Sequence, residues 1–580
     1  MARRSKNAYD PRSSILDPQH APSPPFPLSQ KEPMPSSPAS EPRLPTRGAN
    51  GRYAPLFVLL AALLLYVLRF GYDYGASDQD EFLPYLLHRL DPELLAQDWF
   101  VLTQASSFGI RTYFVMLLQA IALVVPVWLV ILILYMGAWL LIAGAVYERG
   151  YAVTRTRLAA GAAVVVALVL TPQWTLGGND LVHSMLVPSM CGWGLGLWGI
   201  VFFLRYRPGQ AAFLLGAATW LQALVGLQLA GLLGLILLWR LIANRGGGRH
   251  LLLFAGVYAM AALPVLGPLL LQQLSGATPV EDAPSMFYIL AQFRVPHHYL
   301  FYSFPARSLV RFGALMVLGL TSLVLLHRRQ RVHYSTFLIR TLGCIAGLCV
   351  LAFLFTEIRP VFFVVQLQLF KTTVLAKLLF VILICGGVFA WLPAPFARPL
   401  DRLMDLKGWG LAAVLGIWLL AIGSVFLGFE VLRAKAGPLA HKGTPTEQVE
   451  TWARTQTPRD AVFAVPPSWS GFRSRARRAI VVNYKAFPYR DRLNLTWFER
   501  LTQMAPISLP QRSGPAIQDS LDAAFLRQPV PALHRLADRY DFDYVVRDRR
   551  FTPASSSFEQ VYISGEWIVY RIVSEDRPAE

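Results

Sequence analysis

Long runs of apolar residues recur along this chain and limit its fold more than any other feature. A transmembrane helix needs about 20 mostly apolar residues. Runs near that length fall at 54–70, 113–147, 158–172, 185–204, 210–224, 226–242, 251–272, 307–327, 335–355, 372–392 and 409–429. The chain of 580 residues is 54% hydrophobic and only 15% charged, which is unusual for a water-soluble protein. The sequence therefore predicts a polytopic α-helical membrane protein with about 11 spans.

The loops between these runs differ in charge, and the difference predicts their side of the membrane. Cytoplasmic loops are enriched in Lys and Arg. The basic loops are 148–157, 205–210, 240–250, 327–334 and 397–407, and the loops placed outside are 71–111, 173–184, 275–306 and 356–360. Much of the net charge of +19 lies in short loops, so membrane topology explains it without a nucleic-acid partner.

Two regions flank the membrane part, which is predicted at 53–429. Residues 1–52 are rich in Pro and Ser and are expected to form a disordered cytoplasmic tail. This tail puts the first apolar run too far inward for a typical cleaved signal peptide. The four cysteines lie within apolar runs, so neither disulfides nor a thiol-ligated metal site is indicated. Eleven spans place the region 430–580 outside, opposite the tail.

The region 430–580 has the pattern of a small water-soluble α/β domain. "TPTEQVETWARTQTPRD" predicts a helix with Thr446 as its N-cap and Pro458 beyond its end. "AVFAVPP", "RAIVVNYK", "YDFDYVV" and "EWIVYRI" have the β-branched and aromatic content of short strands. The region has no Gly-rich phosphate loop and no catalytic-triad signature, so its own chemistry is not indicated.

The stretch "GASDQDEFLPYLLHRLDPELLAQDWF" (75–100) carries many carboxylates directly after the first span. One interpretation is structural: Ser77 and Asp80 form a capping box, and Asp91 caps a second helix that begins at the next residue. The other is functional, because three carboxylates within four residues repel one another and persist where they hold a cation or remove a proton. The residues from Phe82 to Leu90 are amphipathic and predict a short helix on the membrane surface.

This acidic loop (71–111) resembles that of the membrane-embedded C-type (GT-C) glycosyltransferases, which take sugars from polyprenyl-phosphate carriers. Protein mannosyltransferases and aminoarabinose transferases of that superfamily have an acidic pair, a short helix and a second acidic-aromatic element there. The matching elements are Asp80-Glu81-Phe82, the helix through Leu90, and Asp98-Trp99. The resemblance covers residues 54 to 580. It is greatest to bacterial proteins of unassigned function that share "D-Q-x-x-x-L-P", "L-D-P", "R-x-P-H-H" and "W…TP-x-D-A".

The resemblance implies a chemistry for the acidic loop. In the superfamily the loop acid binds the acceptor or deprotonates its hydroxyl while the donor's sugar-phosphate bond breaks. An anionic carboxylate also stabilises an oxocarbenium-like transition state. Asp80 matches the motif best, Asp78 is the alternative, and Glu81 has a supporting role. The acids of this chain are spread over four positions, so the motif does not decide which one is central.

A polyprenyl-phosphate donor needs cations at the outer membrane surface. The candidates on that side are Arg294, His297, His298, Arg359, Lys371 and Lys377. Simpler interpretations stay open: the histidines lie at headgroup level after a helix end, and Arg359 and Lys371 snorkel to the interface. Lys377 lies deeper, where an ionisable group is a functional hypothesis by default. A histidine pair without a third spaced ligand is a weak metal signal, so the metal is unknown and a divalent cation is the one cofactor left open.

The sequence therefore predicts a glycosyltransferase of the bacterial inner membrane that acts at the periplasmic face, with its N-terminus cytoplasmic and its C-terminus periplasmic. Its partners are a polyprenyl-phosphate sugar donor, membrane lipid, and a glycan, lipid or protein acceptor. One alternative is a lipid or polysaccharide transporter, although charges within the spans are sparse and no repeated halves are evident. The other is a non-catalytic partner in polysaccharide assembly that keeps the fold.

Overall fold

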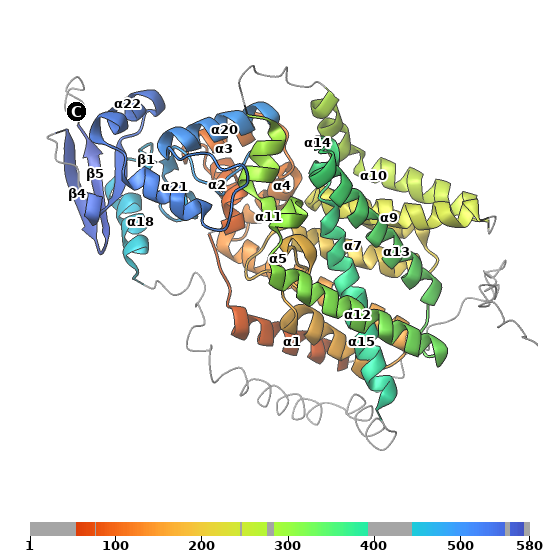
Figure 1. Ribbon diagram of the computed structural model, residues 1–580. Helices are drawn as coiled ribbons and strands as arrows, with labels where there is room; N and C mark the ends of the chain where they lie inside the picture. Colours follow the sequence, from red (N-terminus) through yellow and green to blue (C-terminus); the bar gives the residue numbers. More distant parts are fainter. Residues whose placement is uncertain are drawn as a thin grey trace, which may run out of the picture. The chain divides into compact units, whose positions relative to one another are not determined.

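The structure is a computed structural model, and it describes residues 54–75, 77–243, 246–274, 284–392, 443–551 and 557–573. The predicted tail at 1–52 and the apolar run at 409–429 lie outside the described residues. The described chain is mostly helical, with a small sheet near its C-terminal end (Figure 1).

The predicted apolar runs fold into helices. They form α1 (Ala54–Phe70), α4 (Thr112–Ala122), α5 (Val127–Thr154), α6 (Arg157–Val165), α7 (Pro188–Leu204), α8 (Pro208–Leu221), α9 (Ala223–Ile242), α10 (Gly248–Leu274), α12 (Ala306–Arg328), α13 (Ser335–Phe353) and α15 (Thr373–Trp391). Among the described residues, six apolar helical segments are long enough to cross a membrane, compared with the eleven runs predicted for the whole chain. The chain is thus a multi-pass helical membrane protein.

Two of the predicted runs divide at identifiable residues. The run 113–147 breaks before Pro126, which is the N-cap of α5 and has no backbone N–H to continue a helix. The run between α8 and α9 breaks at Gln222, whose backbone is extended (φ −151°, ψ 99°). This second break lies close to the boundary between the predicted runs 210–224 and 226–242.

Small residues let the membrane helices approach one another closely. A Cβ atom on Gly196 of α7 would lie 2.5 Å from Leu229 of α9, and one on Gly216 of α8 would lie 2.3 Å from Ala261 of α10. Close backbone approach at small residues is a common way for membrane helices to pack. This packing fixes α9 and α10, which both line the cavity described below.

The last described apolar span is interrupted near its start. It consists of α14 (Phe362–Gln366), the 3₁₀ turn η9 (Leu369–Thr372) and α15. Gln368 lies at the break with a left-handed backbone (φ 47°). The Gln228 side chain of α9 donates hydrogen bonds to the carbonyls of Leu367 (2.5 Å) and Gln368 (3.1 Å). Irregular backbone at membrane depth needs such partners, and here it positions Lys371 in η9.

The acidic loop folds into η3 (Ser77–Glu81), α2 (Leu83–Leu90) and α3 (Trp99–Ala105). The predicted short helix is confirmed as α2, whereas both predicted caps are wrong. Asp80 bonds to the C-terminal domain instead of completing a capping box with Ser77. Asp91 starts a series of turns, and the next helix is capped by Asp98, which accepts a bond from the Val101 N–H at 3.1 Å.

The C-terminal domain is an α/β domain, as predicted. Its elements are α18 (Pro445–Gln456), β1 (Val462–Ala464), α19 (Phe472–Arg475), β2 (Ala479–Ile480), α20 (Asp491–Met504), α21 (Ile517–Leu526), α22 (Val530–Tyr540), β3 (Tyr544–Asp548), β4 (Phe558–Ser564) and β5 (Trp567–Ile572). The sheet order is β2-β1-β3-β5-β4, parallel from β2 to β3 and antiparallel beyond. The predicted N-cap Thr446 is wrong by two residues, because Thr444 forms the capping box with Glu447.

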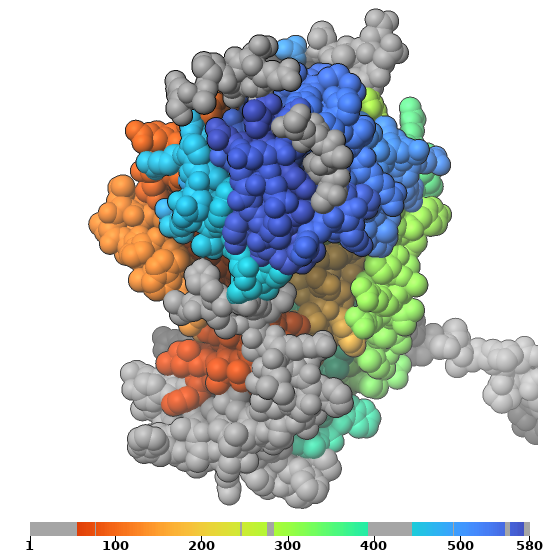
Figure 2. All heavy atoms as spheres, turned by 90° about the vertical axis from the view of Figure 1, so that its left-hand side faces the viewer, coloured from red at the N-terminus to blue at the C-terminus, as the bar shows by residue number. Residues whose placement is uncertain are grey.

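The C-terminal domain shares a hydrophobic core with the membrane part. The ring of Phe293, in the π-helical turn η6 (Tyr288–Arg294), lies 5.1 Å from that of Phe498 and 6.4 Å from that of Trp497, both in α20. In Figure 2 the domain forms one continuous cyan and blue surface, with orange and green residues of the earlier chain at its sides. The C-terminal domain therefore contacts both the acidic loop and η6, and residues of both segments line the cavity described below.

Candidate functional site

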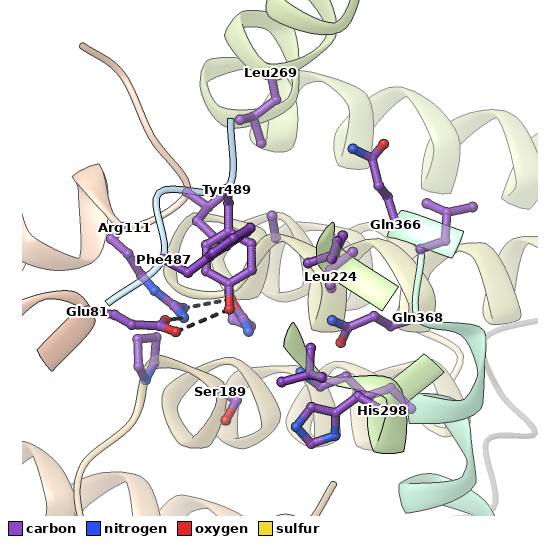
Figure 3. A pocket seen from close by; sticks show the side chains of 18 of the residues that line it. Glu81, Arg111, Ser189, Leu224, Leu269, His298, Gln366, Gln368, Phe487 and Tyr489 are labelled. Carbon is purple, nitrogen blue, oxygen red and sulfur yellow. Dashed lines mark hydrogen bonds and ion pairs between the residues drawn. The ribbon is translucent and has the colours of Figure 1, made fainter. Parts of the chain in front are cut away.

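A cavity of about 740 Å³ lies between the acidic loop, the membrane helices and the C-terminal domain. Its charged and titratable lining residues are Asp78, Glu81, Arg111, His183, Arg294, His298, Lys371, Lys485, Tyr489, Arg490 and Arg492. The remaining lining is largely apolar (Figure 3). A cavity of this size with a few converging polar groups is the usual form of a small-molecule site.

Glu81 is held by donors from three parts of the chain. Its carboxylate forms an ion pair with Arg111 at the start of α4, and it accepts a hydrogen bond from the Tyr489 hydroxyl at 3.1 Å (Figure 3). A guanidinium nitrogen of Arg294, in η6, lies 3.6 Å from the other oxygen of the Glu81 carboxylate. Because two guanidinium groups balance one carboxylate, Glu81 organises this wall of the cavity rather than offering it a free negative charge.

Asp78 is the more open of the two cavity acids. Its side chain is 41% exposed and forms an ion pair with Lys485 of the C-terminal domain. Burial acts to raise the pKa of Asp78, but the Lys485 ammonium, with His183 and Arg111, holds it below its usual range. Asp78 is thus an ionised carboxylate that faces the cavity and has a single ion-pair partner among the described residues.

Lys371 and His183 line the same cavity as the two acids. Lys371 is 7% exposed, and no hydrogen bond or ion pair holds its ammonium among the described residues. Burial lowers the pKa of His183, although Asp78 and Asp180 nearby oppose this shift. The ring is therefore neutral near pH 7, and Lys371 is a buried cation of the cavity whose ammonium has no protein partner among the described residues.

Arg294 is positioned by the Lys485 carbonyl and by two aromatic rings. Its guanidinium lies 5.3 Å from the Tyr484 ring and 5.5 Å from the Phe487 ring, and it donates to the Lys485 carbonyl at 2.7 Å. Its Nε–H is buried and has no acceptor within the described part of the chain. A buried donor without an acceptor is costly, so this group favours a bound ligand or water with an acceptor oxygen.

The apolar part of the cavity is built by three membrane helices. It is lined by Leu224 and Leu227 of α9, Leu266, Leu269 and Leu270 of α10, and Phe362 and Phe363 of α14. Leu270 is 53% exposed and Phe363 is 54% exposed. The apolar lining therefore continues to the surface of apolar helices, where lipid chains have access.

Asp80, the best match to the family motif, does not line the cavity. Its carboxylate is fully buried and accepts hydrogen bonds from the Gly471 N–H (2.8 Å) and the Asn483 side chain (3.0 Å). Burial raises the pKa of Asp80 to about 6, although these donors and two arginines oppose the shift. Its assignment as the central acid stays a prediction, and Asp78 and Glu81 are the two acids of that set that reach the cavity.

Asp98, the second acid of the family motif, also faces the C-terminal domain. It forms a buried ion pair with Arg473 at 2.6 Å and accepts a bond from the Ile480 N–H at 3.0 Å. Arg475 of the same basic run pairs with Glu450 at 2.6 Å. Two arginines of the basic stretch 473–478 are therefore engaged in internal ion pairs.

The predicted phosphate ligands separate into two groups. Arg294, His298 and Lys371 line the cavity, whereas His297, Arg359 and Lys377 do not. Arg359 is exposed, and the ammonium of Lys377 is fully buried against Asp180 at 2.7 Å. Glu357 pairs with Arg512 at 2.9 Å rather than with Arg359. Lys377 is accordingly a partner in a buried ion pair, the structural alternative for an ionised group within a span.

His298 approaches the Gly-rich loop 173–184 closely. Its Nδ1 lies 2.5 Å from the Gly177 carbonyl, and a Cβ on Gly177 (φ 72°) would lie 3.1 Å from the His298 carbonyl. A carbonyl only accepts, so Nδ1 carries the proton and Nε2 is an acceptor in the neutral ring. Burial lowers the pKa of His298 to about 3, and the ring therefore brings no positive charge to a phosphate.

Several charged and titratable residues of the cavity escaped sequence reasoning, among them Arg111, His183, Lys485, Tyr489, Arg490 and Arg492. Lys485 and Tyr489 meet the acidic loop across about 400 residues of chain, as the separation of 408 between Tyr489 and Glu81 shows. No short motif carries such a signal. Arg111 was also missed, although it had a local signal: it is a basic residue at the end of the predicted acidic loop.

Comparisons with known proteins give two kinds of match. The model of a family described as "Domain of unknown function (DUF6798)" matches residues 444–504, which include one wall of the cavity. The fold is similar to ArnT from Cupriavidus metallidurans in the apo state, at 14% identity and a TM-score of 0.48, over 89% of this chain and 97% of that one. It is also similar to ArnT from the same organism bound to undecaprenyl phosphate, at 16% identity and a TM-score of 0.46, over 92% and 100%.

No curated protein matches the chain. The matched family model covers less than half of the sequence and names no activity.

Proposed function

We propose that this protein is a glycosyltransferase that takes a sugar from a polyprenyl-phosphate donor at the periplasmic face of a bacterial inner membrane. The observation that carries the proposal is the two-part cavity: an apolar lining on membrane helices continues into a polar end with cations and two acids. A lipid with an apolar chain and a phosphate headgroup has the matching distribution of polarity.

Lys371 and Arg294 are the proposed ligands of the donor phosphate. Lys371 has an ammonium without a protein partner among the described residues, and Arg294 has a buried Nε–H without an acceptor. Phosphate oxygens accept several charge-assisted hydrogen bonds at once, so they satisfy both groups. The isoprenoid chain then lies along the leucines of α9 and α10 and beside Phe363.

Asp78 is the proposed acid of the transfer step. It is ionised and half-exposed to the cavity, so it orients the acceptor hydroxyl and stabilises positive charge that develops on the sugar. An anionic headgroup that engages Lys485 also weakens the Lys485–Asp78 pair, which raises the basicity of Asp78 when the donor is bound. The hydroxyl proton passes to Asp78 as the new glycosidic bond forms and the lipid phosphate leaves.

The test is sugar transfer from labelled undecaprenyl-phosphate-linked sugars by the purified protein in lipid nanodiscs. Asp78→Asn is expected to lower transfer by about 100-fold, the usual loss for a group that assists proton transfer. Asp91→Asn, which changes an exposed acid of the same loop, is the matched control and keeps the wild-type rate. Equal transfer by wild type and Asp78→Asn would remove Asp78 from the reaction.

A non-catalytic lipid-binding partner in polysaccharide assembly is the second candidate. One observation favours it: Glu81 and Asp78 are both paired with cations of the protein. In that case wild-type protein binds undecaprenyl phosphate and Lys371→Met weakens the binding, yet no donor sugar is transferred. Binding and transfer measured on the same preparation therefore separate the two candidates.

A further inference from the structure

The stretch 483–490, here called the wall segment, joins the C-terminal domain to the cavity. Lys485 forms the ion pair with Asp78, and Tyr489 donates to Glu81 at 3.1 Å. Arg294 donates from its guanidinium to the Lys485 carbonyl at 2.7 Å. One short stretch of the C-terminal domain therefore contacts both cavity acids and one proposed phosphate ligand.

The wall segment is anchored at its first residue by Asp80. The side-chain nitrogen of Asn483 donates to Asp80 at 3.0 Å, and the side-chain oxygen of Asn483 accepts from the Ala486 N–H at 3.0 Å and from Arg473 at 3.1 Å. The Gly471 N–H donates to both oxygens of Asp80 at 2.8 Å. Asp80 and Asn483 thus connect the acidic loop to the turn that precedes Phe487.

The approach of the two regions at this point is unusually close. Gly471 has a positive φ of 86°, and a Cβ atom on it would lie 2.1 Å from the Gly75 carbonyl. Ser77 donates its backbone N–H to the Ser470 hydroxyl at 3.1 Å. No cation forms an ion pair with Asp80 in the described part of the chain, so its contacts are directional hydrogen bonds to neutral groups. Such contacts fix an orientation more strictly than they balance a charge.

We infer that Asp80 is a positioning residue, which with Asn483 and Gly471 seats the wall segment so that Lys485 and Tyr489 face the cavity acids. The C-terminal domain is then part of the site, since it supplies two of the side chains that line the polar end. The inference rests on the proposed function only for its effect on a lipid phosphate. Asp80 itself contacts no ligand in this arrangement.

The first test measures the seating without any ligand. Hydrogen–deuterium exchange is followed in peptides that cover residues 470–490 of the full-length protein, for wild type, Asp80→Ala, Asp91→Asn and the exchange Asp80→Asn/Asn483→Asp. The exchange keeps one donor and one acceptor in the pair with their roles reversed. Asp80→Ala is expected to speed exchange by about tenfold, since the Gly471 N–H loses its acceptor. The double exchange restores protection, and Asp91→Asn keeps it.

The second test measures binding of undecaprenyl phosphate to the same four proteins in nanodiscs. Asp80→Ala is expected to weaken binding by about tenfold, with recovery in the double exchange, because Lys485 is no longer held at the polar end. If Asp80→Ala does not give a monodisperse protein, Asp80→Asn, which keeps one acceptor oxygen, replaces it in both tests.

Two results would overturn the inference. One is a wild-type rate of hydrogen exchange at 470–490 in Asp80→Ala. The other is a double variant, Asp80→Asn/Asn483→Asp, in which these peptides are no better protected than in Asp80→Ala. If wild-type protein fails to bind undecaprenyl phosphate, the proposed function fails, and the exchange rates still decide whether Asp80 seats the wall segment.

Discussion

The two faces of η3 carry acids of the same sequence cluster in opposite surroundings. Asp78 is half-exposed, is paired with Lys485 and has a lowered pKa. Asp80 is fully buried, accepts bonds from neutral groups and has a raised pKa. Two residues of separation on a tight 3₁₀ turn are enough to place one acid in a cavity and the other in a domain interface. Environment, rather than proximity to a motif, thus assigns the role of each acid.

The buried contacts between the acidic loop and the C-terminal domain should matter most for stability. Asp98→Ala tests this and has the largest expected effect. Asp98 and Arg473 are 0% and 1% exposed, so removal of the carboxylate leaves a buried guanidinium without its counter-ion. We expect a loss of about 3–5 kcal/mol in the free energy of unfolding, measured by thermal unfolding in detergent. The double variant Asp98→Leu/Arg473→Met should lose less, since it leaves no unpaired charge. A loss below about 1 kcal/mol for Asp98→Ala would contradict the buried pair.

The titration of Asp80 should appear in the pH dependence of stability. Burial raises its pKa from 3.8 to about 6, so the folded state binds the proton more tightly than the unfolded chain does. The contribution is present below about pH 4 and is lost as the pH rises to about 6, by up to about 3 kcal/mol. Asp80→Asn should lack this decline. Parallel stability curves for the two proteins between these pH values would show that Asp80 does not titrate there.

The residues that line the cavity should matter for ligand binding. Lys371 lines the cavity and Lys377 does not, so the two lysines offer a matched pair of variants. Lys371→Met should weaken undecaprenyl phosphate binding by about tenfold and leave the unfolding temperature unchanged or higher, because its ammonium has no protein partner among the described residues. Lys377→Met should lower the unfolding temperature, because it leaves Asp180 buried and unpaired. A Lys371→Met variant that binds normally would remove this residue from the phosphate site.

The smallest effect on stability is expected at the solvent-exposed ion pairs between the acidic loop and the C-terminal domain. Arg459 pairs with Asp91 and Glu93 there, but all three side chains are 44% exposed or more. Asp91→Asn should change the free energy of unfolding by less than about 0.5 kcal/mol, and this difference should shrink further in high salt. A larger change would mean that exposed pairs share the seating role given to Asp80.

The sequence predicted most of the fold because apolar runs form spans whatever surrounds them. The division between α8 and α9, the helix α2 and four of the five strands follow from local composition, whereas the break before Pro126 was not predicted. The strand β4, "FEQVYIS", was missed because its burial does not alternate and the polar pair Glu559 and Gln560 lies exposed near its start, at a sheet edge. The Thr444 cap was missed because Thr446 stands in the same short polar stretch.

The site was less accessible to sequence reasoning than the fold. Arg294 and Lys371 were found because a cation near a membrane boundary is a signal in itself. Lys485 and Tyr489 were missed since their role depends on the contact between the wall segment and the acidic loop. The motif also pointed first to Asp80, because local sequence cannot show which side of η3 faces the cavity.

The hydrogen bonds from Gln228 to the break before α15 bear on how the chain inserts into a bilayer. An isolated segment 362–391 would bring the Leu367 carbonyl into hydrocarbon without its Gln228 donor. The donor belongs to a helix made about 140 residues earlier during translation. This late segment therefore reaches its final shape only after it finds α9, and biogenesis of the polar cavity must follow lateral assembly of the helices.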